Sequence, residues 1–323
     1  MKERVEFDQF YQETLKPQLR ALDEVRKTKI KTIGKIILGI VGPFILAYFI
    51  SKGLSIAGNF SVLLFLLALI MAIYFGFKFI KKYRRNKYTE TFKKQIIAPI
   101  VHFISDDLQY YPKREIPRSD YKKSRLFLEN TDRYEGEDFV EGQIDKTLIH
   151  FSELHTQYKS TNSKGETRWH TIFRGLFFVG DFNKDFKGST VLLPNHMGSG
   201  FSFFKKLWGS NRKEKLVELA DPEFMDNYTC YSTDDIQARY ILSPALMKRL
   251  NDFHKKYPNN EVCLSFVDGQ IFIAITYNKD LFEPSFFSSV VNKKKVLSYF
   301  DDIKLTVEIV EDLNLNTRIW TKN

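Results

Sequence analysis

Two long apolar runs near the start of the chain constrain its fold more than any other feature. Residues 33–50 and 60–77 each form a run of about 18 residues, or roughly 27 Å as an α-helix. This length is close to the hydrocarbon thickness of a bilayer, about 30 Å, so the runs predict a transmembrane hairpin. The second run has no charged residue. The first contains Lys35 near its start and Pro43 in its middle, both of which a membrane helix tolerates.

Two other interpretations of these runs fit less well. A secretory signal peptide is disfavoured because about 30 mostly polar residues precede the first run and no small-residue cleavage site follows it. Two helices buried in a protein core remain the alternative.

The distribution of lysine and arginine predicts the orientation of the hairpin. The cations that flank the two runs are Arg26, Lys27, Lys29, Lys31, Lys35, Lys78, Lys81, Lys82, Arg84, Arg85 and Lys87. The connection between the runs offers only Lys52. Because cytoplasmic flanks of membrane helices are enriched in Lys and Arg, we expect both termini to be cytoplasmic.

The same cations account for the basic character of the chain. The 323 residues contain 49 Lys and Arg against 39 Asp and Glu, a net charge of +10. Without the 11 flanking cations, 38 Lys and Arg face 39 acids, so the rest of the chain is close to neutral. A nucleic-acid partner is therefore not expected. The expected partners are the lipid bilayer, its anionic head groups and a protein of unknown identity.

Amphipathic helices are predicted on both sides of the hairpin. Before it, an apolar stripe recurs at steps of three and four: Phe7, Phe10, Tyr11, Leu15, Leu19, Leu22 and Val25. After it, a second stripe follows the same spacing: Phe92, Ile96, Ile97, Ile100, Phe103 and Ile104. Both segments contain the pattern F-x4-[LI]-x-P-x4-[LI], with Pro17 and Pro99 at matching positions. Chance agreement at four positions remains an alternative for the pattern. Each proline predicts a kink or a break in its helix.

The remaining sequence predicts an α+β domain with a mainly antiparallel sheet. The segment PKREIPRSD is expected to be a linker or the first loop of the domain. The runs KTLIHFSELHTQYK, RWHTIFRGLFFVGDF and STVLLP predict a long hairpin and a third strand, and KLVEL and YTCYST predict short strands. A second hairpin is centred on VDGQ, and helices are expected over SPALMKRLNDFHKKY and about 292–313. The predicted organisation is an amphipathic helix at 1–32, the hairpin at 33–80, a basic flank and helix at 81–109, and the α+β domain at 110–323.

Several motifs resemble one known family. They are FYxxxLxP, FKxxIIxPI, DRYEGEDFVEGQI, RWHTIFRGLFFVGDFNKDFKG, DPEF, ARYILSPALM and LNLNTRIW, which together extend over nearly the whole chain. They are similar to the bacterial membrane-protein family named domain of unknown function 3137 (DUF3137). The resemblance implies an anchor in a bacterial cytoplasmic membrane. It implies no established activity and no agreed catalytic residues.

The first domain hairpin carries the residues that we weigh as catalytic candidates. Period two places Trp169, Phe173 and Phe177 on one face, expected to be the core face, and His170 and Arg174 on the other. Glu153 on the preceding strand is a candidate partner for Arg174, although the strand register is open. The pattern favours a structural ion pair between Glu153 and Arg174 over a general acid/base site.

No recognised metal or cofactor motif occurs in the sequence. His150 and His155 are five residues apart, which puts them on opposite faces of a regular strand. The acidic run DRYEGED lacks the spacing of a calcium loop and is expected to be a solvated loop. Cys230 and Cys263 each stand alone in the sequence, which favours a reducing compartment, and a disulfide between the two is the alternative. We expect no metal and no cofactor.

A segment rich in aromatic residues and lysine is a candidate for contact with the membrane interface. Its candidate residues are Phe201, Phe203, Phe204, Lys205, Lys206 and Trp208. The alternative is a loop whose aromatic rings fill the domain core. The favoured function is a membrane-anchored module that binds a protein or a lipid, with a membrane-tethered hydrolase or transferase as the alternative.

Overall fold

The computed structural model divides into two compact units. It describes residues 4–53, 58–84, 87–182, 184–195, 213–256, 261–277, 279–285, 288–313 and 315. The helical unit consists of Lys2–Pro99 and Glu283–Leu297, and the sheet unit of Ile100–Phe282 and Ser298–Asn323. Residues 283–297, which follow the last strand in the sequence, thus belong to the helical unit.

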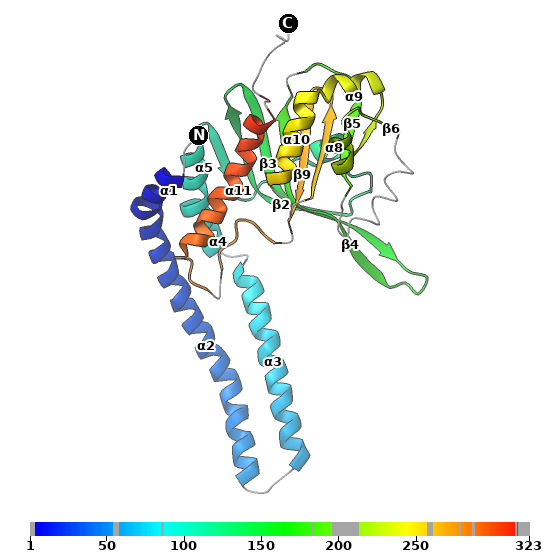
Figure 1. Cartoon of the computed structure of the whole chain (residues 1–323). Helices are drawn as coiled ribbons and strands as arrows, with labels where there is room; N and C mark the ends of the chain where they lie inside the picture. Colours follow the sequence, from blue (N-terminus) through cyan, green and yellow to red (C-terminus); the bar gives the residue numbers. More distant parts are fainter. Residues whose placement is uncertain are drawn as a thin grey trace. The chain divides into compact units, whose positions relative to one another are not determined.

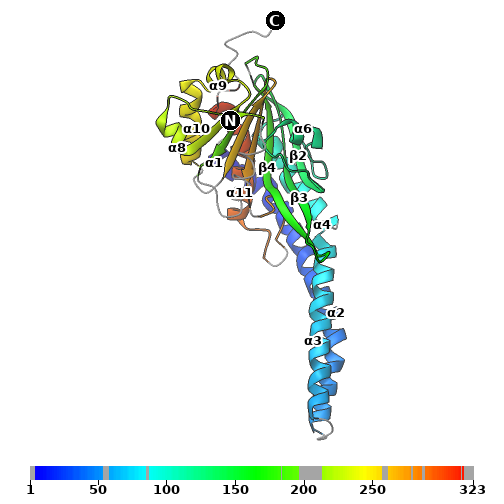
Figure 2. The same cartoon turned by 90° about the vertical axis from the view of Figure 1, so that its right-hand side faces the viewer.

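Long helices dominate the helical unit. Its elements are α1 (Arg4–Phe10), η1 (Tyr11–Leu15), α2 (Lys16–Gly53), α3 (Gly58–Arg84), α4 (Lys87–Phe92) and η2 (Lys93–Ile97), followed by the start of α5 (Ala98–Ile104). The helices α2 and α3 run side by side in opposite directions (Figures 1 and 2). Within the described ranges, no helix combines the length and the apolarity that crossing a membrane requires.

A π-helical turn precedes each of the two matching prolines. The turn η1 ends two residues before Pro17, and η2 ends two residues before Pro99. The amides of Lys16 and Ala98 donate to carbonyls five residues earlier, at Tyr11 and Lys93. The predicted kink or break is therefore replaced by a widened turn, a form in which one extra residue enters a continuous helix. Both copies of the sequence pattern fold in this same way.

The spacing of the buried residues explains the widened turns. Residues at steps of four are fully or almost fully buried in each segment: Phe7, Tyr11, Leu15 and Leu19, and Phe92, Ile96, Ile100 and Ile104. In an α-helix each step of four overshoots a full turn by about 40°, so three steps rotate the stripe by about 120°. One extra residue recovers about 100° of this rotation and keeps the stripe straight. Val25, predicted to extend the first stripe, is instead 46% exposed.

Nine strands in the described residues form one antiparallel sheet, in the order β1-β2-β3-β4-β9-β8-β5-β7-β6. The strands are β1 (Leu108–Tyr111), β2 (Arg133–Ile144), β3 (Thr147–Thr161), β4 (Thr167–Asp181), β5 (Ser189–Pro194), β6 (Lys215–Val217), β7 (Tyr228–Ser232), β8 (Val262–Val267) and β9 (Gln270–Thr276). The helices are α6 (Arg118–Lys123), α8 (Pro222–Asn227), α9 (Asp235–Ile241), α10 (Pro244–Lys256) and α11 (Lys293–Asp312), the last of which begins in the helical unit. The predicted α+β class with an antiparallel sheet is confirmed.

The two faces of the sheet are covered by different elements. Figure 2 shows α6 on one face and α10 on the other. The α6 face holds a core in which Tyr121 stacks on Phe127 and contacts Phe177. The segment PKREIPRSD supplies the fully buried Ile116 to this core. It therefore contributes to the domain core instead of acting as a linker.

Local turn chemistry fixes the second hairpin. Asp268 and Gly269 between β8 and β9 have φ angles of 47° and 76°. Two positive φ angles in succession define the tight turn that matches the twist of an antiparallel pair, and Asp-Gly favours this turn. The hairpin predicted from VDGQ is confirmed.

A β-bulge in β4 makes the predicted assignment of side chains to its two faces partly wrong. Thr156 of β3 is opposite Phe173, whereas Gln157 is opposite Thr171, so Ile172 is the extra residue. A bulge shifts the alternation of side chains by one position. Phe173 and Phe177 lie in the core as predicted, but Trp169 does not share their face and is 42% exposed.

The acidic run DRYEGED is also corrected by the structure. It is not a solvated loop, because β2 begins at Arg133 and pairs with β3 through Glu135, Gly136 and Glu137. The pairing shifts between Glu137 and Val140, which identifies a second bulge. Strand pairing with the long β3 thus overrides the low strand propensity of Asp and Glu.

Candidate functional site

The candidate residues Glu153, Arg174 and His170 lie on the paired strands β3 and β4, but not together. Glu153 is opposite Leu176, and Arg174 is opposite His155, so Glu153, His155 and Arg174 share the face away from Phe177. The bulge at Ile172 puts His170 on the other face. Four residues of strand also separate His170 from Arg174 by about 13 Å. The structure therefore brings Glu153 and Arg174 to one region and leaves His170 outside it.

Glu153 is a buried carboxyl group. Only 6% of the residue is exposed, and its Oε2 accepts a hydrogen bond from the Leu281 amide at 3.0 Å. Burial raises the pKa of the Glu153 carboxyl to about 8, and the nearby carboxylates of Asp138 and Asp280 act in the same direction. The Leu281 hydrogen bond opposes this change of the pKa. A side chain in this state holds a proton at neutral pH.

Asp138 sits in the bulge of β2, near Glu153. It is fully buried, it has a φ angle of 62°, and it accepts a hydrogen bond from the Tyr110 hydroxyl. A left-handed conformation at a residue other than glycine costs about 1 kcal/mol or more, and such strain concentrates at functional sites. Asp138 was missed as a site residue because its acidic run was interpreted as a loop, although the density of acids was a usable signal.

Arg174 forms its ion pair with Asp280, not with Glu153. The distance from Nη2 to Oδ1 is 2.5 Å, and both side chains are about one third exposed. The carbonyl of Arg174 also accepts a hydrogen bond from the Tyr277 amide at 3.1 Å. The chain after β9 is thus held on the sheet by three interactions, at Tyr277, Asp280 and Leu281. The predicted pair of Glu153 with Arg174 is replaced by two separate anchors for the same segment.

His155 completes this group of titratable residues. Its Nε2 lies 3.2 Å from Oγ1 of Thr171. Burial lowers the pKa of the imidazole, and the Arg174 charge lowers it further. His155 is therefore neutral at physiological pH and acts as a hydrogen-bonding partner of the strand.

His170 and His150 have structural partners on the opposite face. His170 stacks on Tyr158, with ring centroids 4.8 Å apart, and its Nε2 lies 2.8 Å from the Ser160 hydroxyl. His150 contacts Asp120 of α6 at 3.2 Å. His150 and His155 lie on opposite faces, as their spacing predicted. No group of three potential metal ligands occurs within the described part of the chain.

A second group of buried charges lies in the helical unit, where residues 283–297 contact the helices. Lys93 is 2% exposed, and its ammonium lies 3.1 Å from the carboxylate of Glu283. Asp23 accepts the Val290 amide at 3.2 Å and the Arg26 guanidinium at 2.9 Å. Burial opposes the ionisation of Asp23, but these hydrogen bonds outweigh it and hold the pKa below its ordinary value. These contacts could not be predicted from local sequence patterns, because the partners are nearly 200 residues or more apart.

The candidates for a membrane-interface contact cannot be placed. Phe201, Phe203, Phe204, Lys205, Lys206 and Trp208 all lie outside the described residues. Their role stays a prediction.

Comparisons with known proteins match part of the chain to one family model. No curated protein matches the chain. One similar solved structure is the crystal structure of the mycobacterial trehalose monomycolate transport factor A, TtfA, at 12% identity and a TM-score of 0.32. The match covers 67% of this chain and 96% of that chain, but at this TM-score it supports no argument about fold or function. The family model described as "Protein of unknown function (DUF3137)" matches residues 171–315. The resemblance to DUF3137 drawn from the sequence motifs is thereby confirmed over these residues.

Proposed function

We propose that the protein is anchored in a bacterial cytoplasmic membrane by α2 and α3, and that its sheet unit binds a protein or lipid partner at the cytoplasmic side. In this proposal the sheet unit acts as a binding module. Both ends of the helical hairpin lie on the cytoplasmic side in this proposal.

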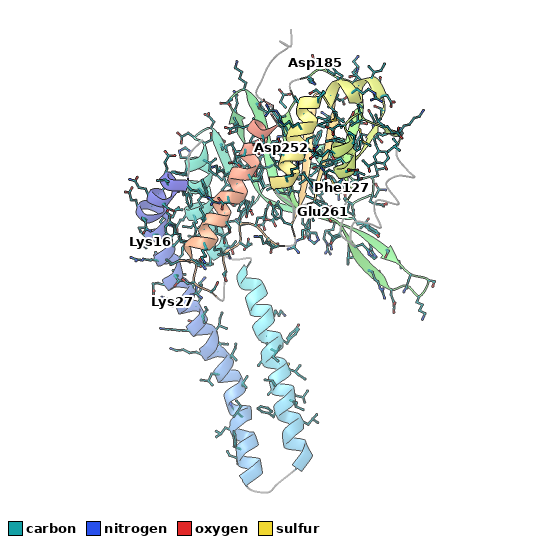
Figure 3. The ribbon with its side chains drawn as sticks, in the orientation of Figure 1. Lys16, Lys27, Phe127, Asp185, Asp252 and Glu261 are labelled. Carbon is teal, nitrogen blue, oxygen red and sulfur yellow. The ribbon has the colours of Figure 1, made fainter. Side chains whose placement is uncertain are left out.

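The observation that carries the proposal is the apolar surface of α2 and α3. Among the described residues of the two apolar runs, 33–50 and 60–77, fifteen large apolar side chains are between 36% and 68% exposed, including Leu38, Phe49, Ile70 and Ile73. Many of the side chains drawn along both helices point outward from the pair (Figure 3). Soluble monomers rarely expose apolar patches larger than about 300–600 Å². In a hydrocarbon environment this apolar surface no longer has the free-energy cost of contact with water.

The sequence of the hairpin supports the same environment. Residues 60–77 carry no charge, and the lysines and arginines gather at the ends of the two runs. Both runs include side chains outside the described set, so the proposal rests on the sequence together with the exposure of the described residues. Clustered cations beside a span favour binding to anionic lipid head groups.

One observation favours a second candidate, a membrane-tethered hydrolase or transferase. The pKa of Glu153, raised to about 8 by burial, is suited to a general acid at neutral pH. The binding module is favoured because Glu153 is engaged by the Leu281 amide, and because Arg174 is engaged by Asp280.

Fractionation of cells that express the full chain tests the proposal. We expect the protein to stay in the membrane pellet after alkaline carbonate extraction. The double variant Ile70→Glu/Ile73→Glu should shift to the soluble or aggregated fraction, because an acid near the bilayer centre costs about 2.5–3.5 kcal/mol. Val25→Glu, at an exposed site outside the apolar runs, is the matched control and should behave as the parent. Release of the parent chain by carbonate would refute the anchor. Mass spectrometry of proteins and lipids recovered from the detergent extract then identifies the partner.

A further inference from the structure

The paired ends of β3 and β4 extend beyond the rest of the sheet. Pairing of β2 with β3 ends at Gln157, and pairing of β9 with β4 ends at Gly175. Residues 158–171, here called the arm, therefore have strand partners only within the β3–β4 hairpin. The arm projects from the sheet as a two-stranded ribbon (Figure 1).

A ribbon of two strands is marginal in water without further support. Most of the arm is exposed, and its support comes from a few contacts near its base. Tyr158 stacks on His170, and the Arg133 guanidinium lies 4.2 Å from the ring centroid of Trp169. The carboxylate of Asp132 accepts the Lys159 amide. These contacts fix the arm in an extended shape and leave its outer part open to a partner.

The arm carries an excess of unpaired positive charge. Lys159, Lys164 and Arg168 are exposed, and none of the three forms an ion pair with a described residue. The arm sequence contains one acid, Glu166, whose Oε2 accepts a hydrogen bond from the side-chain amide of Asn162 at 2.8 Å. The rest of the chain beyond the membrane flanks is close to neutral, so the arm is a local basic protrusion.

An exposed tryptophan, Trp169, is paired with Lys159 across the arm. Trp169 is 42% exposed, although tryptophan favours a buried or interfacial site. Indole rings favour the head-group layer of a bilayer, and nearby cations are attracted to anionic lipids.

We propose that the arm binds anionic lipid head groups through Lys159, Lys164, Arg168 and Trp169. This inference rests on the proposed membrane anchor, because the anchor holds the arm at a high effective concentration near lipid. Weak contacts of four side chains are then sufficient for binding. An acidic protein is the other class of partner with this charge, and the experiment separates the two.

Hydrogen exchange of the full chain in lipid nanodiscs tests the proposal. The nanodiscs contain phosphatidylcholine alone, or phosphatidylcholine with phosphatidylglycerol. We expect amides of residues 158–171 to exchange several-fold more slowly with phosphatidylglycerol, and this protection to be lost at high salt. Lys159→Glu/Arg168→Glu should abolish the protection, and Trp169→Ser should weaken it. The amides around Phe177 report whether each variant remains folded.

The control is a charge reversal of the same size elsewhere in the sheet unit. Lys215→Glu/Lys248→Glu changes two exposed lysines outside the arm and should leave the protection unchanged. Equal exchange of the arm in both kinds of nanodisc would overturn the proposal. Protection by soluble polyglutamate but not by phosphatidylglycerol would also overturn it and would assign the arm to an acidic protein.

Failure of the proposed lipid contact can be distinguished from failure of the proposed membrane anchor. A chain that does not enter nanodiscs contradicts the proposed function, and the arm is then measured on the same chain mixed with preformed phosphatidylglycerol vesicles. Arm protection on those vesicles would support the lipid contact without the anchor, and its absence would refute the contact.

Discussion

Replacement of Glu153 by glutamine is expected to stabilise the sheet unit, by an amount that grows with pH. Burial raises the pKa of the Glu153 carboxyl from 4.5 to about 8. Because the folded pKa is the higher one, the folded chain keeps a proton that the unfolded chain releases between these values. The free energy of unfolding therefore falls as the pH rises from about 4.5 to about 8, and the loss reaches about 5 kcal/mol at most. Glutamine cannot ionise, and its amide oxygen can still accept the Leu281 amide hydrogen bond.

The assay is thermal unfolding of the full chain in detergent, followed by circular dichroism on both sides of this window, near pH 5 and near pH 9. Glu153→Gln should match the parent at the lower pH. At the higher pH a gain of about 2–5 kcal/mol should raise its midpoint by roughly 5–15 °C. Glu311→Gln, at an exposed carboxyl near the end of α11, should leave the unfolding midpoint unchanged at both pH values. A constant difference between Glu153→Gln and the parent across the window would refute the raised pKa. Loss of a catalysed reaction in this more stable variant would favour the enzyme instead.

Two further predictions concern burial in the two units. Glu283→Gln removes an ion-pair partner of the buried Lys93 and should destabilise the helical unit by about 3–5 kcal/mol. Lys93→Met/Glu283→Leu should recover much of this loss, and equal unfolding midpoints for the two variants would contradict the prediction. Phe177→Ala should lower the free energy of unfolding by about 3–5 kcal/mol because the ring is fully buried. His170→Ala, on the exposed arm, should cost about 1 kcal/mol or less. The assignment of Phe177 to the core and of His170 to the exposed arm fails if denaturant titration gives the reverse order.

Elements with a strong local signal could be predicted from the sequence. The hairpin of β8 and β9 follows from Asp268 and Gly269, and α10 follows from its apolar period and from Pro244 at its first position. The long β3 and β4 follow from their length and alternation. In each case the information lies within a few residues of the element that it specifies.

Features that depend on an inserted residue or on distant partners could not be predicted. The bulge at Ile172 adds one residue to β4, and so moves Trp169 and His170 to faces opposite to those that strict alternation assigned. The π-turns before Pro17 and Pro99 likewise insert one residue into each of two helices. The steps of four among the apolar residues are the sequence signal that indicates these insertions. Arg174 forms its ion pair with Asp280 and not with Glu153, because the segment after β9 folds back on the sheet. No local sequence pattern encodes this return of the chain.

Labelling of introduced cysteines tests the membrane anchor most directly. The native Cys230 and Cys263 are buried, so they give a low background. A membrane-impermeant maleimide is applied to intact spheroplasts that carry Ser55→Cys, between the two apolar runs, or Thr161→Cys, on the arm. The anchor with cytoplasmic termini predicts that the cysteine at position 55 reacts from outside and that the one at position 161 reacts only after lysis. Reaction at position 161 in intact spheroplasts, or equal protection of both positions, would contradict the account.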